Sequence, residues 1–177
     1  CHTSYLQGFI TLGNIGGWLE DAAGALEKAS YRGPSRVMPS IEVRTQFVPY
    51  PLCGVIGPWN APMMLVLLDA VPALFAGCAV LLKPSEVTPR FTGPLFDSVR
   101  AVPELAAVFD VVHGDGETGR ALIDQSDVVC FTGSVPTGRK IALQCAERLI
   151  PCYLELGGKD PVIVTASADL ERATTAV

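Results

Sequence analysis

Residues 52–82 read LCGVIGPWNAPMMLVLLDAVPALFAGCAVLL, and this stretch decides the fold class. Leu52–Ile56 is an apolar run of strand length, Ala61–Phe75 is long enough for a helix, and Ala79–Leu82 is a second apolar run. A strand that is apolar on both faces, followed by a helix and another such strand, is typical of a parallel sheet covered by helices.

Part of the same stretch has the length and apolar content of a membrane span. Met63–Leu82 is long enough to cross a bilayer, but Asp69 lies near its middle, and Pro72 and Gly77 divide it. We therefore interpret it as a buried helix, a turn and a strand, and we expect no membrane association.

Strands and helices continue to alternate after this unit. We expect strands at Phe109–Val112, Val128–Phe131, Pro151–Leu154 and Pro161–Val164, and helices at Thr88–Val99, Gly116–Asp124, Ser134–Leu149 and from Asp169 onward. The predicted fold class is α/β with a doubly wound parallel sheet.

The first 50 residues have a different pattern. Residues 4–30 have a helical spacing of apolar residues, Tyr31–Ser40 is rich in Gly and Pro and is predicted to be a loop, and Ile41–Phe47 alternates like a half-exposed strand. We expect residues 1–50 to form an N-terminal part with a helix and an antiparallel strand pair, and residues 51–177 to form the sheet domain.

Composition excludes several function classes. The net charge of the 177 residues is −5 and Lys and Arg do not cluster, which argues against a nucleic acid partner. The two histidines, His2 and His113, lie far apart in the sequence, so no metal site is expected. The six cysteines form no C-x-x-C pair, which favours a reducing, cytoplasmic location, and no signal peptide is visible.

Polar and glycine-rich residues follow the predicted strands. They are Pro58–Asn60, Lys83–Glu86, Gly114–Gly116 and Thr132–Ser134. In open parallel sheets, ligands bind at the carboxyl ends of the strands. These four clusters therefore predict one ligand site at that edge of the sheet.

Two of these turns could bind a phosphate group. Gly114-x-Gly116-x-x-Gly119 has the spacing of a dinucleotide fingerprint, but no acidic residue ends the next strand, where a ribose partner is expected. Phe131-Thr-Gly-Ser134 leads into a longer helix, whose first N–H groups and dipole would attract a phosphate. Ser134 would cap that helix in either case. Spacing alone leaves both turns open.

The stretch Tyr153-Leu-Glu-Leu-Gly-Gly-Lys-Asp-Pro161 contains one carboxylate among apolar residues. Apolar surroundings favour the protonated form of a carboxyl group, which suits Glu155 to take a proton from water. The alternative is a structural Glu155 that pairs with a basic neighbour such as Lys159. We expect Glu155 to lie in a buried strand.

Five motifs together resemble the NAD(P)-dependent aldehyde dehydrogenases. They are Gly57-Pro-Trp-Asn60, Pro72-Ala-Leu, Lys83-Pro-Ser-Glu86, Phe131-Thr-Gly-Ser134 and Leu154-Glu-Leu-Gly-Gly158, in the family's order over residues 41–177. The resemblance implies a Rossmann-like sheet of the aldehyde dehydrogenase type and the oxidation of an aldehyde to a carboxylic acid.

The resemblance also implies roles for individual residues. Asn60 matches the amide that donates to the oxyanion, and Glu155 matches the general base. Ser134 and Trp59 match the pyrophosphate contacts, Gly116 lies near the adenine, and Lys83 and Glu86 meet the ribose, where Glu86 favours NAD over NADP. The remaining matches are Ile56, Gly57 and Pro58 along the cleft and Phe131, Thr132, Leu156 and Gly157 on the nicotinamide side.

The nucleophilic cysteine of the family follows the Glu by a few tens of residues, and no cysteine of this chain takes its place. We therefore expect an internal fragment without the catalytic domain, inactive alone, from a full-length homo-oligomer in which Ile41–Phe47 resembles an assembly strand. Asp69 stands where some members have a lysine proposed to relay protons.

Two alternatives remain open: a nucleotide-binding module without chemistry, and a CoA-acylating enzyme, which would not need Glu155. The substrate aldehyde is not identified by these residues.

Overall fold

The structure, a computed structural model, describes residues 2–176. A five-stranded sheet lies at its centre, in the order β5-β4-β3-β6-β7 with every neighbouring pair parallel. Its strands are β3 (Leu52–Ile56), β4 (Ala79–Lys83), β5 (Phe109–Val111), β6 (Val128–Gly133) and β7 (Cys152–Leu156). The order runs from β3 out to β5 and resumes with β6 on the other side of β3. The doubly wound parallel sheet is therefore confirmed, with its topological switch point between β3 and β6.

Helices cover both faces of this sheet. The helices are α2 (Pro62–Phe75), the short 3₁₀ turn η1 (Pro89–Phe91), α3 (Thr92–Arg100), α4 (Pro103–Ala106), α5 (Gly116–Gln125) and α6 (Val135–Glu147). On the face that we call the α2 face, Val66 and Ala70 of α2 pack against Cys53 and Val55 of β3.

The opposite face, which we call the α6 face, is covered by α5 and α6. Its cluster joins buried residues of these two helices to buried residues of the central strands: Leu122, Ile123, Ile141, Cys145, Ile56, Val129 and Phe131. The alternation of side chains along each strand produces this division, since successive residues point to opposite faces. Burial on both faces explains why the central strands read as continuous apolar runs.

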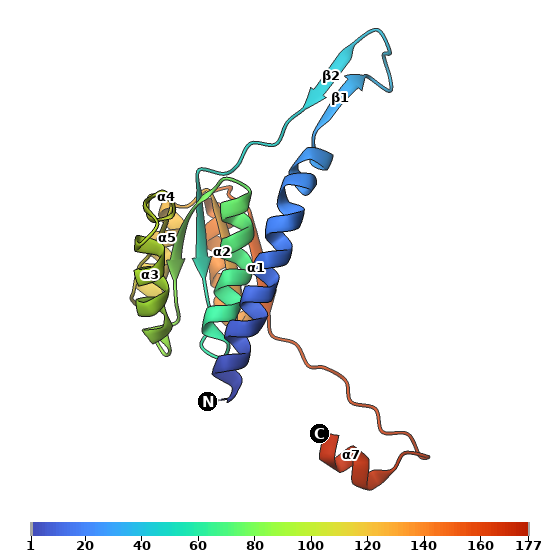
Figure 1. Ribbon diagram of the computed structural model, residues 1–177, viewed down its shortest axis with the longest axis vertical. Helices are drawn as coiled ribbons and strands as arrows, with labels where there is room; N and C mark the ends of the chain where they lie inside the picture. The colour runs from blue at the N-terminus through green and yellow to red at the C-terminus, as the bar shows by residue number, and fades with distance from the viewer. Residues whose placement is uncertain (1, 177) are drawn as a thin grey trace.

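In the N-terminal part, one helix lies along the body and a hairpin projects from it (Figure 1). Helix α1 (His2–Ala29) packs along α2, and the strands β1 (Tyr31–Pro34) and β2 (Glu42–Thr45) form an antiparallel hairpin that projects beyond the body. The predicted loop over Tyr31–Ser40 was therefore wrong for its first four residues. They pair with β2, where Arg32 Nε donates to Glu42 Oε1 at 2.6 Å.

The C-terminal segment also leaves the body. After β7 the chain runs without regular structure to α7 (Leu170–Ala176), well away from the sheet (Figure 1). The predicted strand at Pro161–Val164 was wrong: Val162 and Ile163 are 67% and 84% exposed, and this segment pairs with none of the described strands. A strand needs a neighbour for its backbone hydrogen bonds, and an apolar sequence does not supply one.

The other predicted elements lie within a few residues of the observed ones. The helix expected at Thr88–Val99 begins as the separate turn η1, and α4 was not predicted. Within residues 2–176, no helix combines the length and the apolar character needed to cross a membrane.

Candidate functional site

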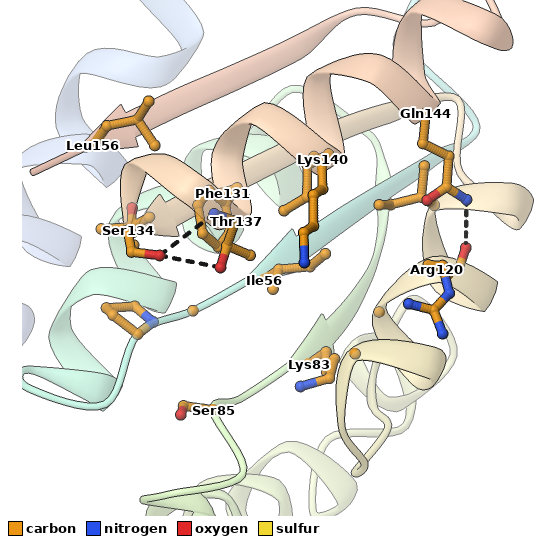
Figure 2. Close-up of a pocket in the computed structure, with 18 of the residues that line it drawn as sticks. Ile56, Lys83, Ser85, Arg120, Phe131, Ser134, Thr137, Lys140, Gln144 and Leu156 are labelled. Atoms are coloured by element: carbon orange, nitrogen blue, oxygen red, sulfur yellow. Dashed lines mark hydrogen bonds between the residues drawn. The ribbon is translucent and has the colours of Figure 1, made fainter.

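A cleft of about 1060 Å³ opens at the carboxyl edge of the sheet. The loops after β3, β4, β6 and β7 line it, together with α5 and α6 (Figure 2). All fourteen residues predicted from the sequence line this cleft: Ile56, Gly57, Pro58, Trp59, Asn60, Lys83, Glu86, Gly116, Phe131, Thr132, Ser134, Glu155, Leu156 and Gly157. The structure thus brings the predicted residues together, while their individual roles stay predictions.

The turn after β3 is held tightly against α2. A Cβ atom at Gly57 would overlap Val66 Cγ1, so only glycine lets the strand end pass this close to the helix. The Thr88 hydroxyl donates to the Trp59 carbonyl at 3.0 Å, which fixes the following loop. Trp59 is 62% exposed and lines the cleft, as does Asn60.

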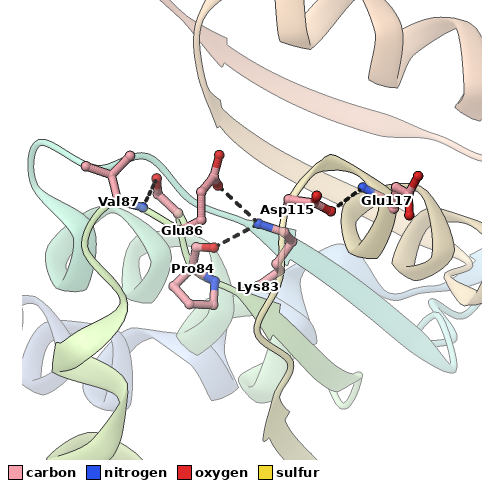
Figure 3. Close-up of polar contacts among 7 residues, drawn as sticks. Lys83, Pro84, Glu86, Val87, Asp115 and Glu117 are labelled. Atoms are coloured by element: carbon pink, nitrogen blue, oxygen red, sulfur yellow. Dashed lines mark hydrogen bonds and ion pairs between the residues drawn. The ribbon is translucent and has the colours of Figure 1, made fainter.

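Lys83 lies at the end of β4 and is almost completely buried. Its Nζ donates to the Pro84 carbonyl at 3.0 Å and lies 3.7 Å from Glu86 Oε2 (Figure 3). A Cβ at Gly119 of α5 would be 3.8 Å from Lys83 Cδ, so the third glycine of the fingerprint-like motif packs against this lysine. The ammonium group is thereby fixed at the mouth of the cleft beside the Glu86 carboxylate.

The turn into α5 carries a negative charge. Asp115 caps the helix, and its Oδ1 accepts the Glu117 N–H at 2.9 Å (Figure 3). Gly114 has φ +150°, a conformation essentially restricted to glycine. In the Gly114-x-Gly116-x-x-Gly119 motif, Gly114 therefore provides a turn conformation and Asp115 an acidic helix cap. The negative charge of this cap disfavours binding of an anion at the first turn of α5.

The turn into α6 carries no charge. Ser134 caps this helix: its Oγ accepts the Thr137 N–H at 3.4 Å and donates to Thr137 Oγ1 at 3.0 Å (Figure 2). The predicted capping role of Ser134 is confirmed. Of the two turns that spacing left open, electrostatics favours the one into α6 for an anion, because a neutral cap leaves the helix dipole uncompensated.

Helix α6 contributes a row of cleft residues that the sequence analysis missed. Thr137, Lys140, Ile141 and Gln144 line the cleft together with Ser134 (Figure 2). Their spacing of three or four residues from Ser134 onward places them on one helical face, so the signal was present in the sequence. Gln144 Nε2 donates to the Arg120 carbonyl at 3.0 Å and to Asp124 Oδ1 at 2.7 Å, which ties α6 to α5.

The expectation that Glu155 is buried was wrong. Strand β7 pairs only with β6 among the described strands, and Glu155 is exposed. An edge strand is covered on fewer sides than a central one, so apolar neighbours in the sequence do not guarantee burial. Glu155 nevertheless lines the same cleft as Asn60. Its alternation with Leu154, which packs on the α6 face, places Glu155 on the α2 face.

A second carboxyl group shares that face. Asp69 of α2 is half-buried, and burial, followed by the charge of Glu155, raises its pKa to about 6. Asp69 is not among the residues that line the cleft.

The five cysteines that the structure describes do not line the cleft, and all of them are free thiols: Cys53, Cys78, Cys130, Cys145 and Cys152. Cys53 Sγ lies 4.0 Å from Cys130 Sγ, and this contact together with burial raises the pKa of the Cys53 thiol. Burial raises the pKa of Cys145 to about 11. These two thiols stay protonated at neutral pH and are poor nucleophiles. Cys1 lies outside the described residues.

Comparison with known proteins identifies the class. The sequence matches the model of the aldehyde dehydrogenase family over residues 9–177. The structure of the proposed aldehyde dehydrogenase PutA of Anabaena variabilis is 50% identical, with a TM-score of 0.90 over 97% of this chain and 36% of that one. A double mutant of betaine aldehyde dehydrogenase from Staphylococcus aureus, in complex with NAD+, is 30% identical, with a TM-score of 0.81 over 95% of this chain and 34% of that one. The chain belongs to the aldehyde dehydrogenase family.

A curated relative gives the same result. A proposed succinate-semialdehyde dehydrogenase [NADP(+)] of Mycolicibacterium smegmatis is 44% identical over 129 residues, which cover 72% of this chain and 25% of the relative. The chain thus spans about a quarter of the length of the curated relatives that it matches. The resemblance stated from the five motifs is confirmed.

Proposed function

We propose that this chain forms the dinucleotide-binding part of an enzyme that oxidises an aldehyde to a carboxylic acid with NAD+ or NADP+. The observation that carries the proposal is the convergence of the loops after β3, β4, β6 and β7 on one cleft. This cleft lies at the topological switch point of the sheet, where doubly wound folds bind nucleotides.

The residues present fit such a cofactor. The cleft volume of about 1060 Å³ is at the upper end of the range for small-molecule sites, roughly 300–1,000 Å³, which suits an extended two-nucleotide ligand. The neutral cap of α6 suits the pyrophosphate, and the paired Lys83 and Glu86 suit the ribose hydroxyls. When bound, the nicotinamide supplies the hydride acceptor.

Two side chains would serve the chemistry. In this proposal the Asn60 amide donates a hydrogen bond to the negative charge that forms on the aldehyde oxygen when a thiolate adds to the aldehyde carbon, and a donor of this kind contributes about 10²–10³ in kcat. Glu155 takes a proton from the water that hydrolyses the thioester, and its exposure leaves it accessible to water. The thiolate that forms the thioester would come from a part of the enzyme outside this chain.

The cofactor could be NAD+ or NADP+, and NAD+ is the first expectation. Glu86 at the ribose position would repel a 2′-phosphate, although its pairing with Lys83 weakens that repulsion. Complexes of the Staphylococcus aureus relative contain NAD+, and the relative from Mycolicibacterium smegmatis is named for NADP+. We propose further that the parent enzyme is a cytoplasmic homo-oligomer with a small aldehyde substrate, in which the projecting β1–β2 hairpin contributes to assembly.

The cofactor part of the proposal can be tested on this chain. Trp59 lines the cleft, and the second tryptophan, Trp18, lies in a groove between α1 and α2. In a Trp18→Phe variant, NAD+ should quench the fluorescence of Trp59 to saturation, and calorimetry should give a matching Kd. A Trp59→Phe variant should show no saturable quenching of Trp18. Absence of quenching and of binding heat with both NAD+ and NADP+ would overturn the proposal.

A further inference from the structure

Four cations and five anions line the cleft, so its overall charge does not attract a dianion. The cations are Lys83, Arg120, Lys140 and Arg148, and the anions are Glu86, Asp115, Asp124, Glu147 and Glu155. The diphosphate of a dinucleotide therefore needs a cation at its own position, because the field of the whole cleft does not hold it there.

Three of these cations already have partners. Lys83 Nζ contacts the Pro84 carbonyl and Glu86. Arg120 lies 3.7 Å from Glu117 Oε1, and Arg148 Nη1 donates to the Ile123 carbonyl and, at 2.8 Å, to the Ser126 carbonyl. Each of these groups is therefore at least partly compensated before a ligand arrives.

Lys140 is the exception. It makes no hydrogen bond and no ion pair with any residue that the structure describes. Its side chain leaves α6 toward the end of β3 at Ile56, with the amino group pointing into the cleft (Figure 2). It lies six residues, less than two turns, after Ser134 and follows Thr137 by three residues on the side of α6 that lines the cleft. Helical side chains lean toward the N-terminus, which directs Lys140 toward the first turn.

The first turn of α6 has few donors for a phosphate. Pro136 has no N–H, and the Thr137 N–H is used by the Ser134 cap at 3.4 Å. Of the first three helical residues, only Val135 keeps an N–H with no acceptor among the described residues. The backbone of this turn therefore satisfies little of a diphosphate, which leaves oxygens of the ligand available to a side-chain cation.

We propose that Lys140 is a cofactor-binding residue whose ammonium group pairs with the diphosphate of the dinucleotide. This inference rests on the proposed function, since it requires that a dinucleotide occupies the cleft. Lys140 supplies one charge-assisted hydrogen bond, and it reaches the ligand from the side of the cleft opposite Lys83 (Figure 2).

The test is calorimetric titration of this chain with NAD+, ADP and adenosine. Lys140→Gln should weaken NAD+ and ADP binding about tenfold, because a hydrogen bond to a charged group is lost. Adenosine, which has no phosphate, should bind equally to the chain and to the variant. Lys140→Arg, which keeps the charge, should retain most of the affinity. The salt dependence of NAD+ binding should be smaller in Lys140→Gln.

Arg139 offers a matched control. It is the preceding residue on α6, it is exposed, and it does not line the cleft. Arg139→Gln removes the same charge from the helix and should leave NAD+ affinity unchanged. An equal loss in both variants would show a general effect of charge and overturn the role of Lys140.

The remaining outcomes separate the two proposals. If the unaltered chain binds NAD+ and Lys140→Gln binds it equally well, the inference fails and the proposed function stands. If Lys140→Gln loses more affinity for NADP+ than for NAD+, Lys140 contacts the 2′-phosphate, and the assignment to the diphosphate is wrong. If the unaltered chain binds neither dinucleotide, both proposals fail.

Discussion

The two faces of the sheet differ in how completely they are covered. On the α6 face, α5 and α6 pack on the strands and are joined by the Gln144 and Arg148 hydrogen bonds. On the α2 face, helix α2 covers β3 and β4, but at β7 the side chains of Tyr153 and Glu155 are exposed.

The two faces also differ in the residues they contribute to the proposed site. Two groups proposed to bind the dinucleotide, Lys83 and the Ser134 cap, are held in place by α5 and α6. The proposed base, Glu155, lies where the sheet is open to solvent, with Asp69 on the same face.

The largest expected effect concerns the α6 face. Ser134→Asp keeps a good helix cap but adds a negative charge where the pyrophosphate is proposed to lie, so NAD+ affinity should fall about a hundredfold while thermal stability is retained. Asp115→Asn, at the cap of α5, should change affinity by less than about threefold. Calorimetry and thermal melting measure both. A larger effect at Asp115 would place the pyrophosphate at α5.

The covered face should also be intolerant of added volume. A Cβ at Gly54 would overlap Leu122 and Ser126 of α5, so Gly54→Ala should destabilise the chain by about 1–3 kcal/mol in urea denaturation. Gly116→Ala is the control, because a Cβ there meets only Arg120 Nη1 at 3.9 Å. Its effect should be within about 1 kcal/mol and can be stabilising, since alanine favours a helix. Equal losses at both sites would contradict close packing of α5 on β3.

The α2 face should respond to pH. The pKa of Asp69 is raised from 3.8 to about 6, so the folded state holds this proton more tightly than the unfolded state. Stability should fall as the pH rises from about 4 to about 6 and then level off. Asp69→Asn removes this loss and should stabilise the chain by about 1–2 kcal/mol at pH 7, after allowance for partial exposure, and by almost nothing at pH 3. If Asp69→Asn is less stable than the unaltered chain at pH 7, the ionised Asp69 carboxylate does not destabilise the fold and the prediction is wrong.

The smallest effect concerns the coupling of the two carboxyl groups. Glu155→Gln should lower the pKa of Asp69 below about 6 and leave it above the ordinary value, because burial is the larger cause and the Glu155 charge the smaller. Carbon-13 NMR of the Asp69 carboxyl group measures this directly. Glu86→Gln, at the far side of the cleft, is the control. If the pKa of Asp69 is unchanged in Glu155→Gln, the two carboxyl groups do not interact electrostatically.

Much of this arrangement was predictable from local patterns. Leu52–Ile56 was placed at its observed bounds, because an apolar run between proline and glycine signals has few alternatives. The polar clusters after the strands were expected to meet, because parallel strands end at the same edge. The choice between the turns into α5 and α6 was not available from spacing, since it depends on the charge of the cap.

Two of the errors share one cause. Glu155 was expected to be buried and Pro161–Val164 to be a strand, and both expectations took apolar sequence as a sign of coverage. Coverage depends on which elements lie beside a segment, and no local pattern contains that information. Lys140 was overlooked for the converse reason: a lysine on a helix is ordinary until the partners of the other cleft cations are known.

By itself the sequence determined the parallel sheet, the set of residues at its carboxyl edge and, through five ordered motifs, the family. These follow from side-chain period, chain direction and residue type, which are local properties. Only the tertiary structure decided that Glu155 is exposed, that burial and the Glu155 charge raise the pKa of Asp69, and that Lys140 points into the cleft without a hydrogen bond or ion pair to any residue of 2–176. Exposure, electrostatic coupling and free charge depend on distances between segments far apart in the chain.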